Sequence, residues 1–182
     1  MRFIFDTIRH YLLFETKNES GEQFSARNVG KMLTKMLNSN EIVAEFGEVN
    51  VTIIPDEDTI QKILKTNTLK RLDMRVDRPN PDDLDQEEEE LYQDMRNQRV
   101  NRIERSYVRE KNAKTIIPSE ATRTLARLAA RNGYVTARYV ERGKVKEEST
   151  KKHPRKQYVE YNGKVESPFQ AFVRVAIEER ES

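Results

Sequence analysis

The chain has 182 residues, enough for one domain of ordinary size or two small ones. Only 36% of its residues are hydrophobic and 35% are charged, which predicts a modest core beneath a strongly ionic surface. With no cysteine and only two histidines, disulfides, thiolate chemistry and histidine-rich metal sites are excluded. It has no run of about 18 apolar residues and no signal-peptide pattern, so we expect a soluble cytoplasmic protein without membrane contact.

The two halves of the chain carry opposite charges, although the whole chain has a formal net charge of +2. Residues 1–95 contain 12 basic and 20 acidic residues, a balance of −8, whereas residues 96–182 contain 21 basic and 11 acidic residues, a balance of +10. Such a separation favours a polyanionic partner for the basic half, or docking between oppositely charged copies. The alternative is that both charge runs are solvated faces of the fold.

Patterns of apolar residues in the first 80 residues predict alternating strands and helices. We expect strands over residues 2–15 and 71–77, a hairpin over 42–54, and helices after the caps Ser25 and Asp56. This order of strand, helix, strand, strand, helix and strand is that of a ferredoxin-like split β-α-β unit. We therefore predict an α+β fold in which residues 1–80 form a ferredoxin-like domain, with a four-stranded sheet and two helices on one of its faces.

Residues 81–182 are expected to form a basic region of helices and a small β-hairpin, packed on the first domain. Acidic residues after Pro81 are followed by basic residues up to Lys114, which we interpret as one long helix whose charges suit its macrodipole. The elements predicted after it are a helix from the cap Ser119 to Asn132-Gly133, a strand over 134–140, a basic loop to Lys156, a short strand over 157–161 and a terminal helix from Ser167.

Basic side chains of this second region are the strongest functional signal. At about 100° per residue, the arginines of each predicted helix fall on one side, and lysines follow in the loop with tyrosines interleaved. The candidate nucleic-acid-binding residues are Arg102, Arg105, Arg109, Arg123, Arg127, Arg131, Lys144, Lys146, Lys151, Lys152, Arg155 and Lys156. Phosphate binding needs dispersed cations on one face, so we expect a non-catalytic nucleic-acid-binding protein without a cofactor or metal, with DNA the favoured ligand.

Two other functions stay open. The chain lacks a phosphate-binding glycine loop, a nucleophile elbow and a His-Glu helix motif, so the common hydrolytic and phosphoryl-transfer classes have no support. The acids Asp82, Asp83, Asp85 and Glu87–Glu90 could gather Mg²⁺ for a nuclease, although consecutive acids at a helix start are more often a solvated N-terminus. The second alternative is a protein assembly module, either a homo-oligomer or a complex with another protein, that uses the oppositely charged halves.

Two segments also resemble proteins of phage defence. One runs from Leu69 through a predicted strand to Pro79-Asn80-Pro81-Asp82-Asp83, and the other is the loop Ser149-Thr150-Lys151-Lys152-His153-Pro154. Both are similar to segments of bacterial proteins related to Rex-type phage exclusion and Kiwa-type antiphage defence. The resemblance implies a DNA-associated accessory or sensor protein of antiphage defence, and it implies no catalytic residue.

Overall fold

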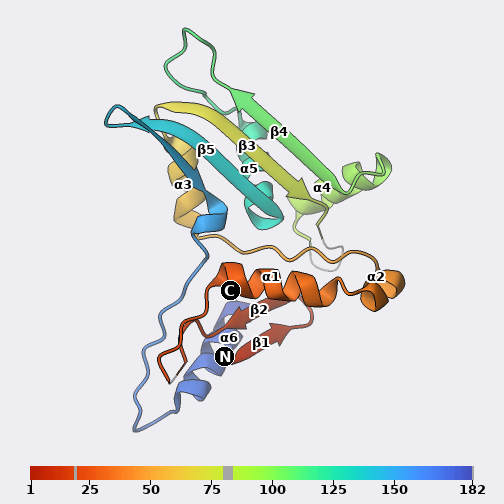
Figure 1. The fold of residues 1–182 in the computed structure, drawn as a ribbon, viewed down its shortest axis with the longest axis vertical. Coiled ribbons are helices and arrows are strands. Elements are labelled where there is room, and N and C mark those ends of the chain that lie inside the picture. Colours follow the sequence, from red (N-terminus) through yellow and green to blue (C-terminus); the bar gives the residue numbers. More distant parts are fainter. Residues whose placement is uncertain (19, 80–83, 182) are drawn as a thin grey trace. The chain divides into compact units, whose positions relative to one another are not determined.

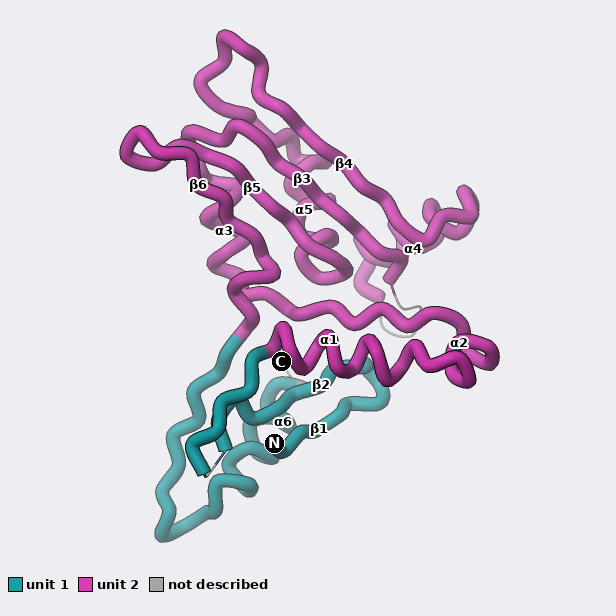
Figure 2. Tube along the Cα trace, viewed as in Figure 1, with its two compact units in different colours: residues 1–25, 156–182 teal, residues 26–155 magenta. Residues whose placement is uncertain are grey.

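The computed structural model describes residues 1–18, 20–79 and 84–181 of the chain. The chain forms two compact units, one made of residues 1–25 and 156–182 and the other of residues 26–155 (Figure 1, Figure 2). This partition differs from the expected domain boundary at residue 80. The strand that ends at Asp77 pairs with strands from the second half of the chain, so both halves contribute to one sheet.

The smaller unit contains a β-hairpin and the last helix. Strands β1 (Phe3–Asp6) and β2 (Tyr11–Phe14) pair antiparallel, where one strand was expected over residues 2–15. The chain turns between them because the Asp6 carboxylate accepts backbone N–H bonds from the two residues that follow Thr7, at 2.8 and 3.1 Å. Such a turn lies within a run of strand-forming residues, so the alternation of apolar side chains does not reveal it.

The C-terminal part of the smaller unit agrees with the prediction in its helix but not in its strand. Helix α6 (Pro168–Glu181) confirms the expected terminal helix. The described residues 157–161 form no strand. A strand needs a partner for its backbone groups, and no ladder hydrogen bonds to this segment are formed by the part of the chain that the structure describes.

The larger unit is built on a four-stranded antiparallel sheet with the strand order β4-β3-β5-β6. The strands are β3 (Leu69–Asp77), β4 (Arg102–Val108), β5 (Gly133–Glu141) and β6 (Lys144–Ser149). The helices are α1 (Ala26–Leu37), α2 (Asn40–Phe46), α3 (Glu57–Lys65), α4 (Gln86–Asn97) and α5 (Glu120–Arg131), with a short 3-10 turn η1 (Thr150–Lys152). Strands and helices share the core, which confirms the α+β class.

The core of this unit lies between one face of the sheet and the helices α3 and α5 (Figure 1). Leu72, Met74 and Val76 alternate along β3 and point into it, where at most 2% of each residue is exposed. Helix α3 contributes Ile63, and the small residues of α5 allow close packing of that helix on β3 and β5. The period of two along β3 thus leaves its polar side chains on the face without α3 and α5.

Several local predictions are confirmed by the helix caps. Asp56 begins α3 by accepting the backbone N–H of Asp58 at 2.9 Å, and Ser119 begins α5 by accepting that of Thr122 at 3.2 Å. The predicted helix after Ser25 is α1. These signals are short-range, so they do not depend on what the helices pack against.

The ferredoxin-like arrangement of the first 78 residues is not formed. The described part of this segment contributes three strands, which are divided between two sheets. The expected hairpin over residues 42–54 was wrong, because residues 40–46 form α2 and the segment up to Ile54 has no strand. Gly47, in the middle of the expected hairpin, instead ends α2 with φ 81°. Ile42, Val43 and Phe46 fit a helical period, whereas Ile42 and Phe46 alone also fit the alternation of a strand.

The long helix expected from Pro81 to Lys114 was also wrong. Its start lies outside the described residues, α4 ends at Asn97, and residues 102–108 form strand β4. The chain reverses at Arg99, whose φ is 58°, and β4 then pairs with β3 along seven residue pairs. Ladder hydrogen bonds with β3 outweigh the helical preference of this charged segment, a tertiary effect that local sequence does not contain.

Candidate nucleic-acid interface

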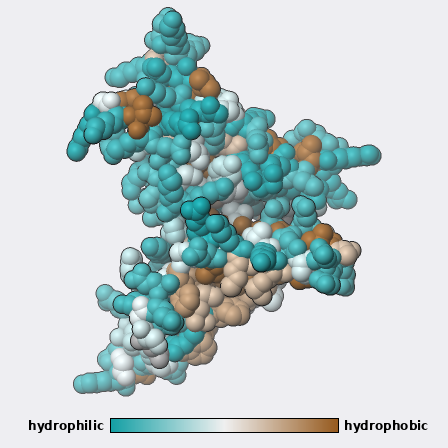
Figure 3. All heavy atoms as spheres, viewed as in Figure 1, coloured by the Kyte–Doolittle hydropathy of each residue, from teal (hydrophilic) through white to brown (hydrophobic). Residues whose placement is uncertain are grey.

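One face of the four-stranded sheet is polar and is not covered by α3 or α5 (Figure 1). We call it the open face and define it by the β3 side chains Arg71, Asp73, Arg75 and Asp77 with their cross-strand neighbours. Register places Ser106 of β4 and Thr136 of β5 on either side of Asp73, and Glu104 and Tyr134 on either side of Arg75. In the space-filling view, hydrophilic residues dominate the region of the four-stranded sheet (Figure 3).

Toward the start of β3, the charges of the open face cancel. Arg71 lies 2.8 Å from one carboxylate oxygen of Asp73, and the other oxygen accepts a 2.6 Å hydrogen bond from the Ser106 hydroxyl. Arg138 of β5 pairs with Glu147 of β6 at 2.9 Å. Two arginines therefore face two carboxylates, and this end of the face has little attraction for an anion.

Toward the end of β3, positive charge is in excess. The carboxylate of Asp77 serves two arginines, Arg75 at 3.0 Å and Arg102 at 2.8 Å. The ammonium of Lys151 lies 3.5 Å above the centre of the Tyr134 ring, and no described carboxylate lies within 4.0 Å of it. A positive charge that has an aromatic face instead of a carboxylate keeps its capacity to pair with an anion.

The chemistry around Lys151 is consistent with this excess. Burial lowers the pKa of Lys151, repulsion from Arg75 and Arg27 lowers it further, and Asp77 acts in the opposite direction. The guanidinium carbon of Arg75 itself lies 5.9 Å from the centre of the Tyr134 ring. We call Tyr134, Arg75 and Lys151 the tyrosine cluster. An anion bound there would relieve the repulsion between its cations.

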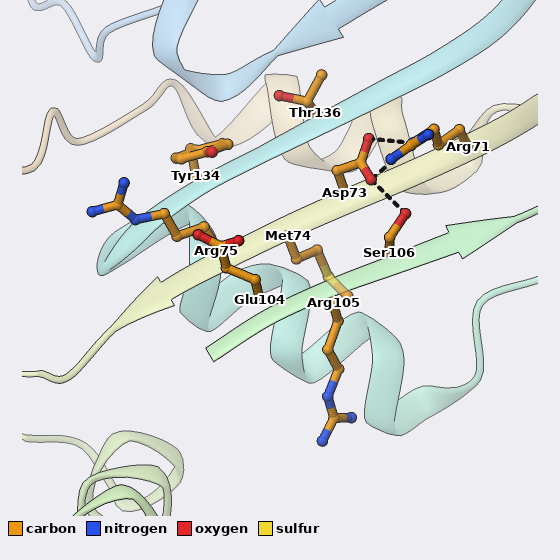
Figure 4. Close-up of a pocket in the computed structure, with 9 residues that line it drawn as sticks. All are labelled: Arg71, Asp73, Met74, Arg75, Glu104, Arg105, Ser106, Tyr134 and Thr136. Atoms are coloured by element: carbon orange, nitrogen blue, oxygen red, sulfur yellow. Dashed lines mark hydrogen bonds and ion pairs between the residues drawn. The ribbon is translucent and has the colours of Figure 1, made fainter. Parts of the chain in front are cut away.

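A depression of about 400 Å³ lies on the open face beside this cluster (Figure 4). Side chains from β3, β4 and β5 line it, among them Asp73, Ser106 and Thr136. They supply both hydrogen-bond donors and acceptors. The depression thus combines an aromatic ring, cations at one end and neutral polar groups, which together suit a ligand with a planar ring and a phosphate.

The three arginines expected on one helix face are separated by the strand. Arg102 lies on the open face with Asp77, whereas Arg105 lies on the opposite face beside Tyr107. There the phenol pKa is lowered, first by a hydrogen bond with Thr122 and, against the effect of burial, also by one with Arg105. Arg109 hydrogen-bonds the backbone carbonyls of Ala113 and Lys114 and so closes the loop after β4. The ridge expected from residues 102, 105 and 109 is not formed, because successive strand residues face opposite ways.

The arginines of α5 do lie on one helix, but two of them form ion pairs with acids at the start of α4. Arg131 pairs with Asp85 and lies 4.0 Å from Glu88, and Arg127 pairs with Glu87 at 3.4 Å. Arg123, half-buried, makes no ion pair with the described residues. The acidic start of α4 and the basic α5 therefore neutralise one another within a single chain.

The remaining candidate cations are dispersed. Lys144 is exposed, Lys146 pairs with Glu141, and β6 holds both on the side opposite to the open face. Lys152 lies 3.4 Å from the backbone carbonyl of Glu147. Arg155 and Lys156 are exposed, at the end of the larger unit and the resumption of the smaller one. Of the lysines, Lys151 is the one that the structure brings to the tyrosine cluster.

Sequence reasoning overlooked the arginines of the open face as binding residues. Arg71 and Arg75 lie within the strand predicted over residues 71–77, and neither they nor Arg138 are among the candidate binding residues. Tyr134 was noted as an interleaved aromatic residue, but its position beside Arg75 depends on the pairing of β5 with β3. The available signal was the alternation of polar and apolar residues along each strand. This alternation does not reveal the strand order that places the polar side chains of β3 and β5 next to each other.

The metal alternative gains no support from the described residues. Among them, no group of three or more histidine, aspartate or glutamate side chains could hold a metal ion. Asp82 and Asp83, on which the nuclease hypothesis depends most, lie outside the described residues. Asp85 instead caps α4, accepting the N–H of Glu88 at 2.9 Å, as expected for an acid at a helix start. No described helix is long and apolar enough to cross a membrane.

Comparison with known proteins identifies the family but no activity. A family model described as a domain of unknown function, DUF4747, matches residues 1–177. The chain belongs to the DUF4747 family. No curated protein and no solved structure matches it. The DUF4747 match covers both units, so the family model includes the open face and the smaller unit. The link to phage-defence families stays a prediction.

The charge of Asp73 makes a testable contribution to stability. Burial acts to raise its pKa, but hydrogen bonds from Arg71 and Ser106 outweigh this effect and hold the pKa below its ordinary value. A carboxyl with a lowered folded-state pKa stabilises the fold above its unfolded pKa of about 3.9, and this contribution is lost as the pH falls through the folded value.

Asp73→Asn is therefore expected to lower the free energy of unfolding at neutral pH, and this difference is expected to shrink as the pH falls through the lowered folded-state pKa of Asp73. Urea unfolding of both proteins across this range measures the difference. If the gap stayed constant down to the lowest pH, the carboxylate charge would not be its cause.

Proposed function

We propose that this protein binds nucleic acid without catalysis, with DNA the favoured ligand, and that the open face of the four-stranded sheet is the binding surface. The observation that carries the proposal is the tyrosine cluster. Lys151 has an aromatic ring in place of a described carboxylate partner, and Arg75 shares its carboxylate with Arg102. Phosphates would pair with this excess of positive charge.

The proposed binding surface is the face of the sheet, in place of the helix arginines that the sequence indicated. Arg127 and Arg131 already contact acids of α4, so a phosphate would have to displace those carboxylates. Surface ion pairs contribute little, about 0–1 kcal/mol each, so α5 remains accessible to a polyanion at a modest energetic cost. Lys151 requires no such displacement, which makes the open face the better first contact.

The assembly alternative has weaker support. Its basis was the attraction between an acidic and a basic half in different copies. In the larger unit the acids of α4 instead contact the arginines of α5 within one chain. Under the preferred proposal, the resemblance to antiphage proteins would make nucleic acid the signal that an accessory or sensor component detects in the cytoplasm.

The proposal predicts salt-dependent binding that weakens when Lys151 is removed. Each phosphate neutralised on duplex DNA contributes about −0.9 to the slope of log affinity against log salt, and about −0.7 on a single strand. Lys151→Ala is expected to weaken binding several-fold at low salt and to make the slope shallower by nearly one such contribution. Fluorescence anisotropy with labelled DNA in a salt series measures both quantities.

Lys144→Ala provides a matched control, because Lys144 is exposed but lies on the opposite side of the sheet. Its affinity and salt slope are expected to equal those of the wild type. Absence of binding to duplex and single-stranded DNA and RNA at low salt would refute the proposed function. Equal effects of the two substitutions would refute the assignment to the open face.

A further inference from the structure

The ring of Tyr134 occupies a distinctive position on the open face. It lies at the start of β5, opposite Arg75 of β3, and is half-buried, so part of the ring is accessible to solvent. Lys151 lies over its centre at 3.5 Å and Arg75 is 5.9 Å away. An accessible aromatic ring flanked by cations is the arrangement with which proteins hold a base and its phosphates in unpaired strands.

The backbone around the ring is firmly anchored. Val135, the next residue, donates its N–H to the hydroxyl of Thr150 at 3.0 Å, and 2% of Thr150 is exposed. Thr136 and Ser149 join their hydroxyls at 3.0 Å. Since Lys151 directly follows Thr150, these bonds fix the backbone that carries Lys151 relative to the strand that carries Tyr134. The backbones that carry the ring and the ammonium are therefore positioned together before any ligand arrives.

We infer that the ligand of the open face is a single strand, and that Tyr134 is the platform on which one of its unpaired bases stacks. This inference rests on the proposed function and narrows it. The base takes the place of the Lys151 ammonium on the ring, and the ammonium exchanges its contact with the ring for an ion pair with an adjacent phosphate. Arg75 offers a second cation beside the same nucleotide.

The shape and chemistry of the face favour a single strand over a duplex. In a duplex the faces of the bases are covered by their neighbours, so a tyrosine ring has no surface on which to stack. Groove readers usually insert a helix or a β-ribbon, whereas here the polar surface is the face of the sheet itself, and α3 and α5 pack on the other face. A single strand presents both base faces and flexible phosphates to such a surface.

The neighbouring polar groups fit the edge of a stacked base. Asp73 offers carboxylate oxygens, while Ser106 and Thr136 carry hydroxyls that donate or accept, and all three line the depression next to Tyr134 (Figure 4). The acids of the face would repel phosphates, but Asp73 and Asp77 are held by arginines. Glu104, across from Arg75 on β4, would repel phosphates and so favour a phosphate path on the Lys151 side of the ring.

The test compares a labelled single strand with a duplex of the same sequence, using anisotropy at one low salt concentration. Tyr134→Ala is expected to weaken binding of the single strand roughly 5- to 150-fold, the range that corresponds to loss of one base–aromatic stack. Tyr134→Phe is expected to retain wild-type affinity, because it keeps the ring. Tyr134→Leu keeps an apolar side chain of similar reach without the ring, and is expected to behave as Tyr134→Ala.

Tyr158→Ala is the control, since Tyr158 is 91% exposed in the smaller unit and is expected to have no effect. Thermal unfolding of each variant verifies that the sheet is intact. If Tyr134→Ala does not fold, Tyr134→Leu still tests the inference. Duplex binding as tight as single-strand binding, with Tyr134→Leu unaltered, would overturn the inference and leave the proposed function standing. Failure to bind either form would overturn both.

Discussion

Gly133→Ala is expected to destabilise the larger unit more than any other single methyl group added to a described glycine. A Cβ at residue 133 would lie 2.0 Å from the backbone oxygen of Arg75 and 2.9 Å from its carbonyl carbon. Both are atoms of the central strand β3, so they cannot move aside as a side chain would. We expect a loss of about 3 kcal/mol or more, since ordinary overpacking costs 1–3 kcal/mol.

Urea or thermal unfolding measures this loss. For a chain of this length 1 kcal/mol corresponds to about 2–4 °C, so the melting temperature should fall by roughly 6–12 °C. Gly30→Ala is the matched control, because its Cβ would meet Ile53 at 3.6 Å, an ordinary contact, within helix α1. Helix propensity predicts a gain of up to about 1 kcal/mol there. Equal stability of the two alanine variants would contradict the close approach of β5 to β3.

Reversing the charge of the tyrosine cluster is expected to abolish measurable binding of nucleic acid. In the variant Arg75→Glu/Lys151→Glu, two cations that would pair with phosphates become anions beside Asp77. Hydrogen bonds to charged groups contribute about 1.5–3 kcal/mol each, so the loss should be at least about 3 kcal/mol, more than 100-fold in affinity. Anisotropy with single-stranded DNA at low salt measures it.

The control for this variant alters the net charge equally but elsewhere. Arg142→Glu/Lys144→Glu changes the turn between β5 and β6, where both side chains are exposed. It is expected to retain most of the affinity and to lose only the long-range attraction, which salt screens within about 8 Å at physiological ionic strength. If both double variants bound equally weakly, overall charge and not the tyrosine cluster would govern binding. Lys151→Glu alone remains informative if the double variant is unstable.

The charge separation between the two halves of the sequence does not show which charges are already paired within the fold. The sum of charges is a property of the sequence, but which charges cancel depends on distance. Arg131 lies 46 residues from Asp85 in the chain and contacts it in space. This ion pair neutralises one of the α5 arginines that the sequence offered for phosphate binding. Lys151 was one lysine among many, and the pairing of β5 with β3 sets it above an aromatic ring next to Arg75.

The sequence by itself determined the features that act over a few residues. Asp56 and Ser119 cap their helices, and the alternation along β3 separates its core side from its polar side, because capping bonds and side-chain direction depend on local geometry. The α+β class followed from these signals.

Only the tertiary structure decided which strands pair. Residues 102–108 satisfy a helical charge pattern, yet they form β4 because β3 offers a ladder of backbone hydrogen bonds along its edge. The candidate interface depends on the same pairing. Arg75, Tyr134 and Lys151 are far apart in the chain and meet because β5 lies beside β3 and Thr150 anchors the turn after β6. Contacts of this kind are set by the free energy of the whole fold and are absent from any local stretch of sequence.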